Sequence, residues 1–279
     1  MPGILDDALE DKFVTLRDSV IEGAVRMRPT LLPGLLESVR VNFNHQRKDL
    51  RLFEIGKTFA AKSGEDELPV ERELFALVIT GQDAQANRGM SQRELDFYDA
   101  KGAIEAAADA IGLKNLQFVE SETRHLRNGQ SATIAYQGKV IGTLGRLDEE
   151  LSGDYKFKQP VYVAELDLQT LLAEETPPDL YHPLSKYPSI VRDVSFLVNR
   201  AITFEEIRAS ILAQGRELCR SVGFVDIYEG KGVDTNERSL TIRLEYRSDE
   251  RTLIETEVDA VHSELIGLVE KDLNIRRRF

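Results

Sequence analysis

The sequence of 279 residues is poor in the residue types that build disulfide scaffolds, metal centres and membrane spans. Its single cysteine, Cys219, cannot form an internal disulfide, which favours a reducing, cytoplasmic compartment. The four histidines do not form any pair with metal-ligand spacing, so we expect no metal site. The longest stretch without a charged residue, 128–138, is far shorter than the roughly 20 apolar residues of a membrane span. We therefore expect no membrane partner.

Sequence motifs of catalysis are also missing. Gly56-Lys57-Thr58 has the end of a phosphate-binding loop, but that loop needs a glycine where Arg51 stands. No serine is surrounded by the glycines of a nucleophile elbow, and nothing in the sequence makes Cys219 reactive. We expect no catalytic residue in this chain.

The composition that remains is that of a globular protein with two domains. Hydrophobic residues make up 42% and charged residues 30%, and the length suits two domains of ordinary size. Four of the nine prolines lie in one polar stretch, 173–188, which predicts a linker. We place the domains at 1–186 and 187–279.

The second domain shows a regular pattern of strands and helices. Val194, Phe196 and Val198 recur at every second position, and two stretches have the Thr-x-x-Glu spacing of a helix start, Thr203 with Glu206 and Thr252 with Glu255. We expect strands at 192–198, 223–229, 239–246 and 273–276, with a helix after each of the two threonines. The order βαββαβ is ferredoxin-like, and it leaves one face of an antiparallel sheet free of helices.

The first domain is predicted to be α+β with an antiparallel sheet. Helical spacing follows Thr30 and recurs from Phe97 to Ile111, ahead of Gly112. Strands are expected at 50–59, 73–81, 132–136, 140–147 and 161–168, with a turn at Gln137-Gly138.

The charge distribution bears on a nucleic-acid partner. The formal net charge is −12, divided as −9 before Tyr187 and −3 from there to the end. Twelve of the 14 basic residues in the second part are arginines, whose planar guanidinium suits phosphates and can stack on bases. The alternative is an ordinary solvated surface.

Several segments, in order along the chain, resemble the beta subunit of bacterial phenylalanyl-tRNA synthetase. The first domain carries Met27-Arg28-Pro29-Thr30-Leu31-Leu32-Pro33-Gly34, Leu52-Phe53-Glu54-Ile55-Gly56 and Asp96-Phe97-Tyr98-Asp99-Ala100-Lys101-Gly102, followed by Gly142-Thr143-Leu144-Gly145. The second carries Tyr187-Pro188, Arg192-Asp193, Asp226-Ile227-Tyr228-Glu229-Gly230-Lys231-Gly232 and Arg251-Thr252-Leu253.

This resemblance implies a fold and a function. The first domain is then a degenerate class II synthetase-like core, and the second a ferredoxin-fold anticodon-binding domain. The family's partners are the catalytic alpha subunit, in an (αβ)₂ assembly, and phenylalanine tRNA. Loss of catalysis fits the residues, because Leu52 stands where motif 2 places its arginine and motif 3 is absent. No cofactor is expected in this chain, whereas the whole enzyme uses ATP and Mg²⁺.

The family's upstream modules have no counterpart in these 279 residues. We expect a C-terminal fragment or a truncated homologue, with an unpaired strand at an edge of its core sheet.

The expected RNA-binding residues lie in the second domain. Unpaired bases are commonly held by aromatic rings and arginine planes, and phosphates by Arg and Lys. The resemblance suggests four positions, and strand parity or the C-terminal cluster adds three: Arg192, Tyr228, Lys231 and Arg276, then Arg243, Arg247 and Arg278. The competing interpretations are a free-standing RNA-binding protein and a regulatory domain that senses an amino acid.

Overall fold

The computed structural model describes residues 13–16, 25–61, 68–84, 89, 91–173, 181, 183–214 and 218–278. The chain divides into two compact units, Met1–Asp179 and Leu180–Phe279. Half of the predicted linker, residues 174–180 and 182, lies outside the described residues. The domain boundary at 186/187 stays a prediction.

The first unit is built on an antiparallel sheet of six strands in the order β1-β2-β6-β5-β4-β3. The strands are β1 (Leu50–Ala60), β2 (Val70–Thr80), β3 (Gln117–Glu120), β4 (Leu126–Tyr136), β5 (Lys139–Leu147) and β6 (Val161–Asp167). The helices are α2 (Leu32–Asn44), α3 (Phe97–Ala110), α4 (Glu149–Asp154) and α5 (Leu168–Ala173). The α+β class and the antiparallel core are confirmed.

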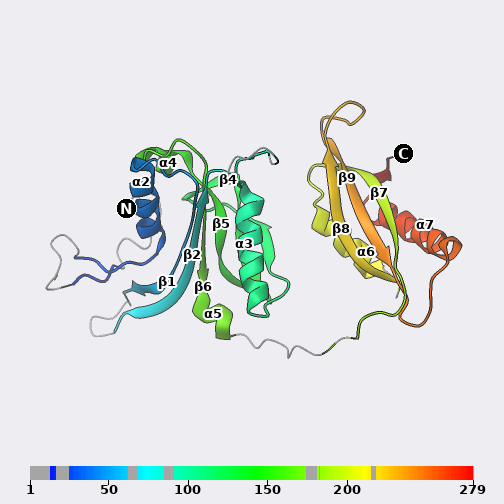
Figure 1. The fold of residues 1–279 in the computed structure, drawn as a ribbon, viewed down its shortest axis with the longest axis horizontal. Coiled ribbons are helices and arrows are strands. Elements are labelled where there is room, and N and C mark those ends of the chain that lie inside the picture. Colours follow the sequence, from blue (N-terminus) through cyan, green and yellow to red (C-terminus); the bar gives the residue numbers. More distant parts are fainter. Residues whose placement is uncertain are drawn as a thin grey trace. The chain divides into compact units, whose positions relative to one another are not determined.

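The two long helices of this unit cover opposite faces of the sheet (Figure 1). Ala76 and Val78 of β2 pack with α2, whereas Leu77 and Ile79 pack with α3. Successive side chains of a strand point to opposite faces, so a strand covered on both faces is apolar throughout. The run Leu74 to Ile79 has this character.

The start of α2 is held by a carboxylate from the sheet. Leu31 is the N-cap but has no side-chain oxygen, and its backbone N–H donates to Glu165 Oε1 of β6 at 2.7 Å. The Thr30 hydroxyl donates to the same carboxylate at 2.8 Å. Burial raises the pKa of Glu165. A residue 134 positions away thus supplies the cap that the local sequence lacks.

Sequence patterns predict the long elements of this unit well and the short ones poorly. The turn Gln137-Gly138 is confirmed, with positive φ at both residues as a two-residue hairpin requires. Strand β4 begins six residues earlier than its predicted start, since it opens at Leu126 and not at Ala132. Three elements were not predicted, β3, α4 and α5, because four to six residues are too few to show a period.

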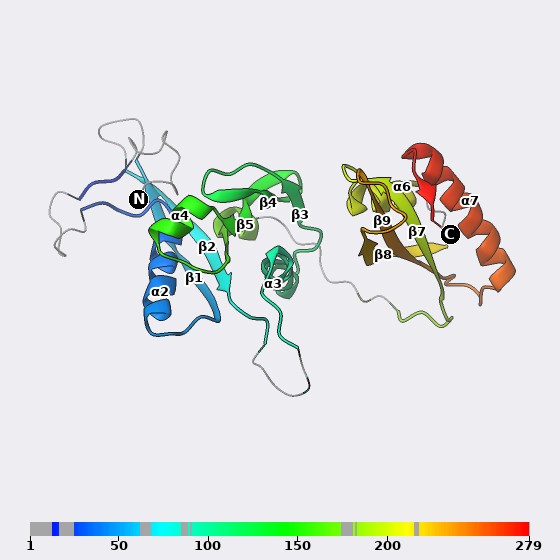
Figure 2. The ribbon, with the colours of Figure 1, turned by 90° about the horizontal axis from the view of Figure 1, so that it is seen from above.

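The second unit has the predicted βαββαβ order. Its elements are β7 (Ile190–Asn199), α6 (Phe204–Gln214), β8 (Cys219–Tyr228), β9 (Glu237–Tyr246), α7 (Glu255–Asp272) and β10 (Arg276–Arg277). The sheet order is β10-β7-β9-β8, and every neighbouring pair is antiparallel. Both helices pack on one face of this sheet (Figures 1 and 2). On that face Ile211 and Val258 belong to the same hydrophobic cluster as Phe196 and Leu240.

The predicted starts of the two helices have different outcomes. The capping box of α6 is confirmed, because Glu206 N–H donates to Thr203 Oγ1 at 3.2 Å and Thr203 N–H to Glu206 Oε2 at 2.7 Å. The prediction at Thr252 is wrong. Leu253 is buried in the core, the N-cap of α7 is Ile254, and no side chain caps it.

The last strand is shorter and lies later than predicted. Helix α7 runs to Asp272 with Leu273 as its C-cap, so β10 is confined to Arg276 and Arg277.

Candidate functional site

In the part of the second unit that the structure describes, one face of the four-stranded sheet carries no helix, and we call it the outer face. Inward side chains are at even positions of β7 and β9, such as Phe196 and Leu240, so odd positions point outward. Cross-strand pairs place the following residues on the outer face: Val191, Asp193, Ser195 and Leu197 of β7; Ser239, Thr241, Arg243 and Glu245 of β9; Ser221, Gly223, Asp226 and Tyr228 of β8; and Arg276 of β10.

An aromatic ring and a guanidinium are stacked on this face. Tyr228 pairs with Ser239, Ser239 with Leu197, and Leu197 with Arg276, which forms one row across the sheet. Arg278 follows β10, donates its N–H to Ser195 O at 2.8 Å, and places its guanidinium carbon 4.6 Å from the centroid of the Tyr228 ring. Tyr228 is 40% exposed. Such a cation–π pair is a flat, partly exposed surface on which a further ring can stack.

Two arginines of the outer face are paired with carboxylates of their own chain. Arg243 donates from Nε and Nη2 to the two oxygens of Asp193 at 2.8 and 2.7 Å. Arg276 donates to Glu237 Oε2 at 2.8 Å. The Arg243 guanidinium holds the pKa of Asp193 below its usual range.

Two other predicted residues lie at the ends of β8 and β9. Lys231 is exposed in the loop between the strands, and its carbonyl oxygen accepts a hydrogen bond from the Tyr228 hydroxyl at 3.4 Å. Arg247 directly follows β9, its Nη1 lies 4.0 Å from Glu245, and its buried Nε has no hydrogen-bond partner.

Arg192 lies apart from the other candidates. It is on the helix-facing side of β7, where its Nε donates to Asp259 of α7 at 2.9 Å. The alternation that buries Phe196 and Val198 places residue 192 on the same side, so sequence parity already indicated this position. The structure therefore brings together Tyr228, Arg243, Arg276 and Arg278, and not Arg192.

Polar residues that sequence analysis did not single out complete the outer face. The hydroxyls of Ser195 and Thr241 share a hydrogen bond of 2.8 Å between the row of Tyr228 and the pair Arg243–Asp193. The sequence held a signal for both residues, since they lie at odd positions of strands whose even positions are mostly apolar.

Leu52 and Glu54, the two residues compared with class II motif 2, make structural contacts in the first unit. Leu52 packs against the core under α2, and Glu54 binds Arg28 Nη1 at 2.6 Å. The Arg28 Nε also donates to Lys57 O at 3.0 Å, so the guanidinium crosses β1 at Gly56. A side chain at Gly56 would collide with Arg28. The glycine of the rejected phosphate-loop motif thus makes room for an arginine.

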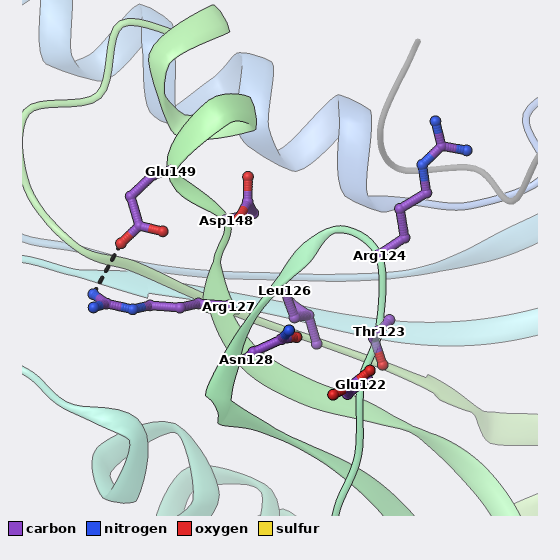
Figure 3. A pocket seen from close by; sticks show the side chains of 8 residues that line it. All are labelled: Glu122, Thr123, Arg124, Leu126, Arg127, Asn128, Asp148 and Glu149. Carbon is purple, nitrogen blue, oxygen red and sulfur yellow. Dashed lines mark ion pairs between the residues drawn. The ribbon is translucent and has the colours of Figure 1, made fainter.

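A polar pocket of about 680 Å³ lies in the same unit (Figure 3). Its lining includes Arg127, which binds Glu149 at 2.8 Å, and Asp148, which accepts the Glu150 N–H at 2.8 Å. These charges are already satisfied by the chain, and none of the predicted binding residues lines the pocket.

Among the described residues, no group of three or more His, Cys, Asp or Glu side chains is arranged to hold a metal ion. No helix in the described ranges is long and apolar enough to cross a membrane.

Two families match this chain. Residues 4–168 match the family described as phenylalanyl tRNA synthetase beta chain CLM domain. Residues 185–278 match the ferredoxin-fold anticodon binding domain.

Its relatives include longer proteins. The phenylalanine–tRNA ligase beta subunit of Bacillus subtilis is 34% identical over 245 residues, which cover 88% of this chain and 30% of that protein. The beta subunit of Legionella pneumophila is 33% identical over 277 residues, 98% of this chain and 34% of the relative. This chain thus spans about a third of the length of these relatives. Among solved structures, a pyrrolysyl tRNA synthetase of Desulfitobacterium hafniense matches with 18% identity and a TM-score of 0.45, over 59% of this chain and 53% of that one.

Proposed function

Because this chain belongs to the phenylalanyl-tRNA synthetase beta-chain family, we propose that its second unit binds the anticodon of phenylalanine tRNA and that its first unit is a non-catalytic scaffold. The RNA lies on the outer face of the sheet β10-β7-β9-β8. The observation that carries this proposal is the stacked pair Tyr228–Arg278 on a face that also holds Arg243 and Arg276.

The chemistry of the outer face suits single-stranded RNA. Unpaired anticodon bases can stack on the Tyr228–Arg278 pair, while hydroxyls such as those of Ser195 and Thr241 offer donors and acceptors to base edges. Lys231 and Arg247 lie at the ends of the neighbouring strands, where the RNA backbone continues. Arg192 has a structural role on the opposite face of the sheet, where it pairs with Asp259 of α7.

The scaffold role of the first unit is supported by two residues that make structural contacts at the positions compared with motif 2. Leu52 packs against the core, and Glu54 is already paired with the Arg28 guanidinium. We propose that ATP and Mg²⁺ act on the catalytic alpha subunit, that two copies of each subunit assemble as (αβ)₂, and that the enzyme works in the cytoplasm. The amino-acid sensor has no support in the comparisons or in the described residues.

Fluorescence anisotropy of labelled phenylalanine tRNA at low salt tests the proposal. We expect the 279-residue chain to bind this tRNA more tightly than the same tRNA with its anticodon bases replaced. Tyr228→Ala should weaken binding of the natural tRNA by about fivefold or more, since one stacked base contributes roughly 1–3 kcal/mol.

Tyr98→Ala is the matched control, because Tyr98 is an exposed tyrosine on α3 of the first unit. It should leave the affinity unchanged. Equal affinity for the two tRNAs, or equal losses in the two tyrosine variants, would contradict the proposed site.

A further inference from the structure

The carboxylate of Asp193 lies on the proposed RNA face, although a negative charge there repels the phosphates of RNA. Its two oxygens accept hydrogen bonds from Nε and Nη2 of Arg243 at 2.8 and 2.7 Å. The Asp193 side chain is 41% exposed and the Arg243 side chain 54%. The pair is directly cross-strand, Asp193 on β7 and Arg243 on β9. An RNA on the outer face therefore meets a cation that already holds an anion.

This pair adjoins the row of the hydroxyls. Arg243 and Thr241 are two positions apart on β9, about 7 Å along a strand, and Ser195 and Asp193 are equally spaced on β7. Arg278 lies beside Ser195 through its backbone hydrogen bond. A strand of RNA stacked on Tyr228 and Arg278 thus places its neighbouring phosphates within reach of Arg243.

A phosphate and a carboxylate compete for the same donors. The guanidinium fork matches either anion with two parallel hydrogen bonds. An exposed ion pair contributes only about 0–1 kcal/mol, so a phosphate can displace Asp193, but the exchange adds little net affinity. Arg276 is in the same state, because Glu237 holds it.

Resting on the function proposed above, we propose that Asp193 is a specificity-determining residue that occupies Arg243 and so prevents RNA from binding the outer face through its backbone alone. Recognition then depends on base stacking and base-edge contacts, since the phosphate contact at Arg243 is obtained only by exchange.

The test compares three forms of the full chain, wild type, Asp193→Asn and Asp259→Asn. Both substitutions remove one carboxylate from an Arg–Asp pair and change the net charge equally, but Asp259 holds Arg192 on the helix-facing side. The probe is an unstructured oligouridylate, with phenylalanine tRNA and its anticodon-replaced form measured alongside by anisotropy.

We expect Asp193→Asn to bind the oligouridylate about fivefold more tightly than either other protein, because Arg243 is then free to pair with a phosphate. The slope of log affinity against log salt should steepen by about 0.7, as for one added phosphate contact on a single strand. Adding Arg243→Gln to Asp193→Asn should abolish the gain.

Three results would overturn the inference. These are equal gains in the two asparagine variants, a loss of affinity in Asp193→Asn, and a gain that persists without Arg243. The proposed function fails separately, if wild type binds the two tRNAs equally, because the oligouridylate comparison does not depend on the anticodon.

Discussion

At the scale of single residues, the space around a position decides what it tolerates. Gly142 of β5 lies against the backbone of β6, where an added Cβ would meet the carbonyl oxygen of Glu165 and lie 2.9 Å from the Cα of Leu166. A paired strand cannot shift cheaply. Gly142→Ala should therefore lower the free energy of unfolding by about 1–3 kcal/mol, measured by urea denaturation.

Gly102→Ala is the control for this substitution. Gly102 lies inside α3, and an added Cβ would meet no atom within 4 Å. Alanine should raise the free energy of unfolding there by about 0.5–1 kcal/mol, because glycine is a poor helix former. If both variants lost stability equally, the close approach at Gly142 would not be the cause.

His125 should give the first unit a dependence on pH. Burial lowers its pKa to about 4 from the ordinary 6.5, and its Nε2 has no hydrogen-bond partner. The unfolded chain then takes up a proton at a higher pH than the folded one. The contribution of neutral His125 to the free energy of unfolding is fully present above about pH 6.5. It is lost as the pH falls toward 4, by on the order of 3 kcal/mol.

The contribution of His125 is measured as a difference between two proteins. Other groups titrate in the same range, such as Glu165, whose raised pKa acts in the opposite direction. Urea denaturation of wild type and His125→Gln from pH 7 to pH 4 isolates the histidine. The free energy of unfolding of the wild type should fall relative to that of the variant as the pH decreases. A difference between the two proteins that does not change with pH would contradict the prediction.

At the scale of elements, the start of a helix depends on whether its cap is made. Thr203 exchanges hydrogen bonds with Glu206 at the start of α6, and these bonds lower the pKa of Glu206. Thr203→Ala should cost about 1 kcal/mol at neutral pH. This loss should shrink as the pH falls below about 4.5, because protonation of Glu206 weakens the cap in the wild type.

Thr252→Ala is the control, since Thr252 has the same spacing from a glutamate but does not cap α7. Its effect on the free energy of unfolding should stay within a few tenths of a kcal/mol. Thermal or urea unfolding of the two variants separates a cap that is present from one that only the spacing suggests.

At the scale of the whole molecule, each unit has a hydrophobic core of its own. Ile242 is fully buried among the strands and helices of the second unit, and Ile134 between the sheet and α3 of the first. Ile242→Ala should destabilise the second unit by about 2–5 kcal/mol and leave the first unchanged. Hydrogen exchange resolved by peptide reports the two units separately.

Ile134→Ala should give the converse result. Protection should fall in peptides of the first unit only. Loss of protection in both units from either substitution would mean that they unfold as one.

The sequence by itself determined the two units, the long helices and strands, the capping box of α6 and the missing synthetase motifs. These features are local, because alternation and helical spacing depend on residues a few positions apart. The parity that places Arg243 on the uncovered face is of the same kind, and it also indicated that Arg192 lies on the other side.

Only the tertiary structure decided which partners these side chains take. Arg243 meets Asp193 across 50 positions, Leu31 is capped by Glu165, and Arg278 reaches Tyr228 from the C-terminal end. Such contacts depend on strand register and sheet order, which bring distant residues side by side and leave no periodic trace in the chain. The short elements β3, α4 and α5 were also decided by the tertiary structure, because long-range packing and not local periodicity defines them.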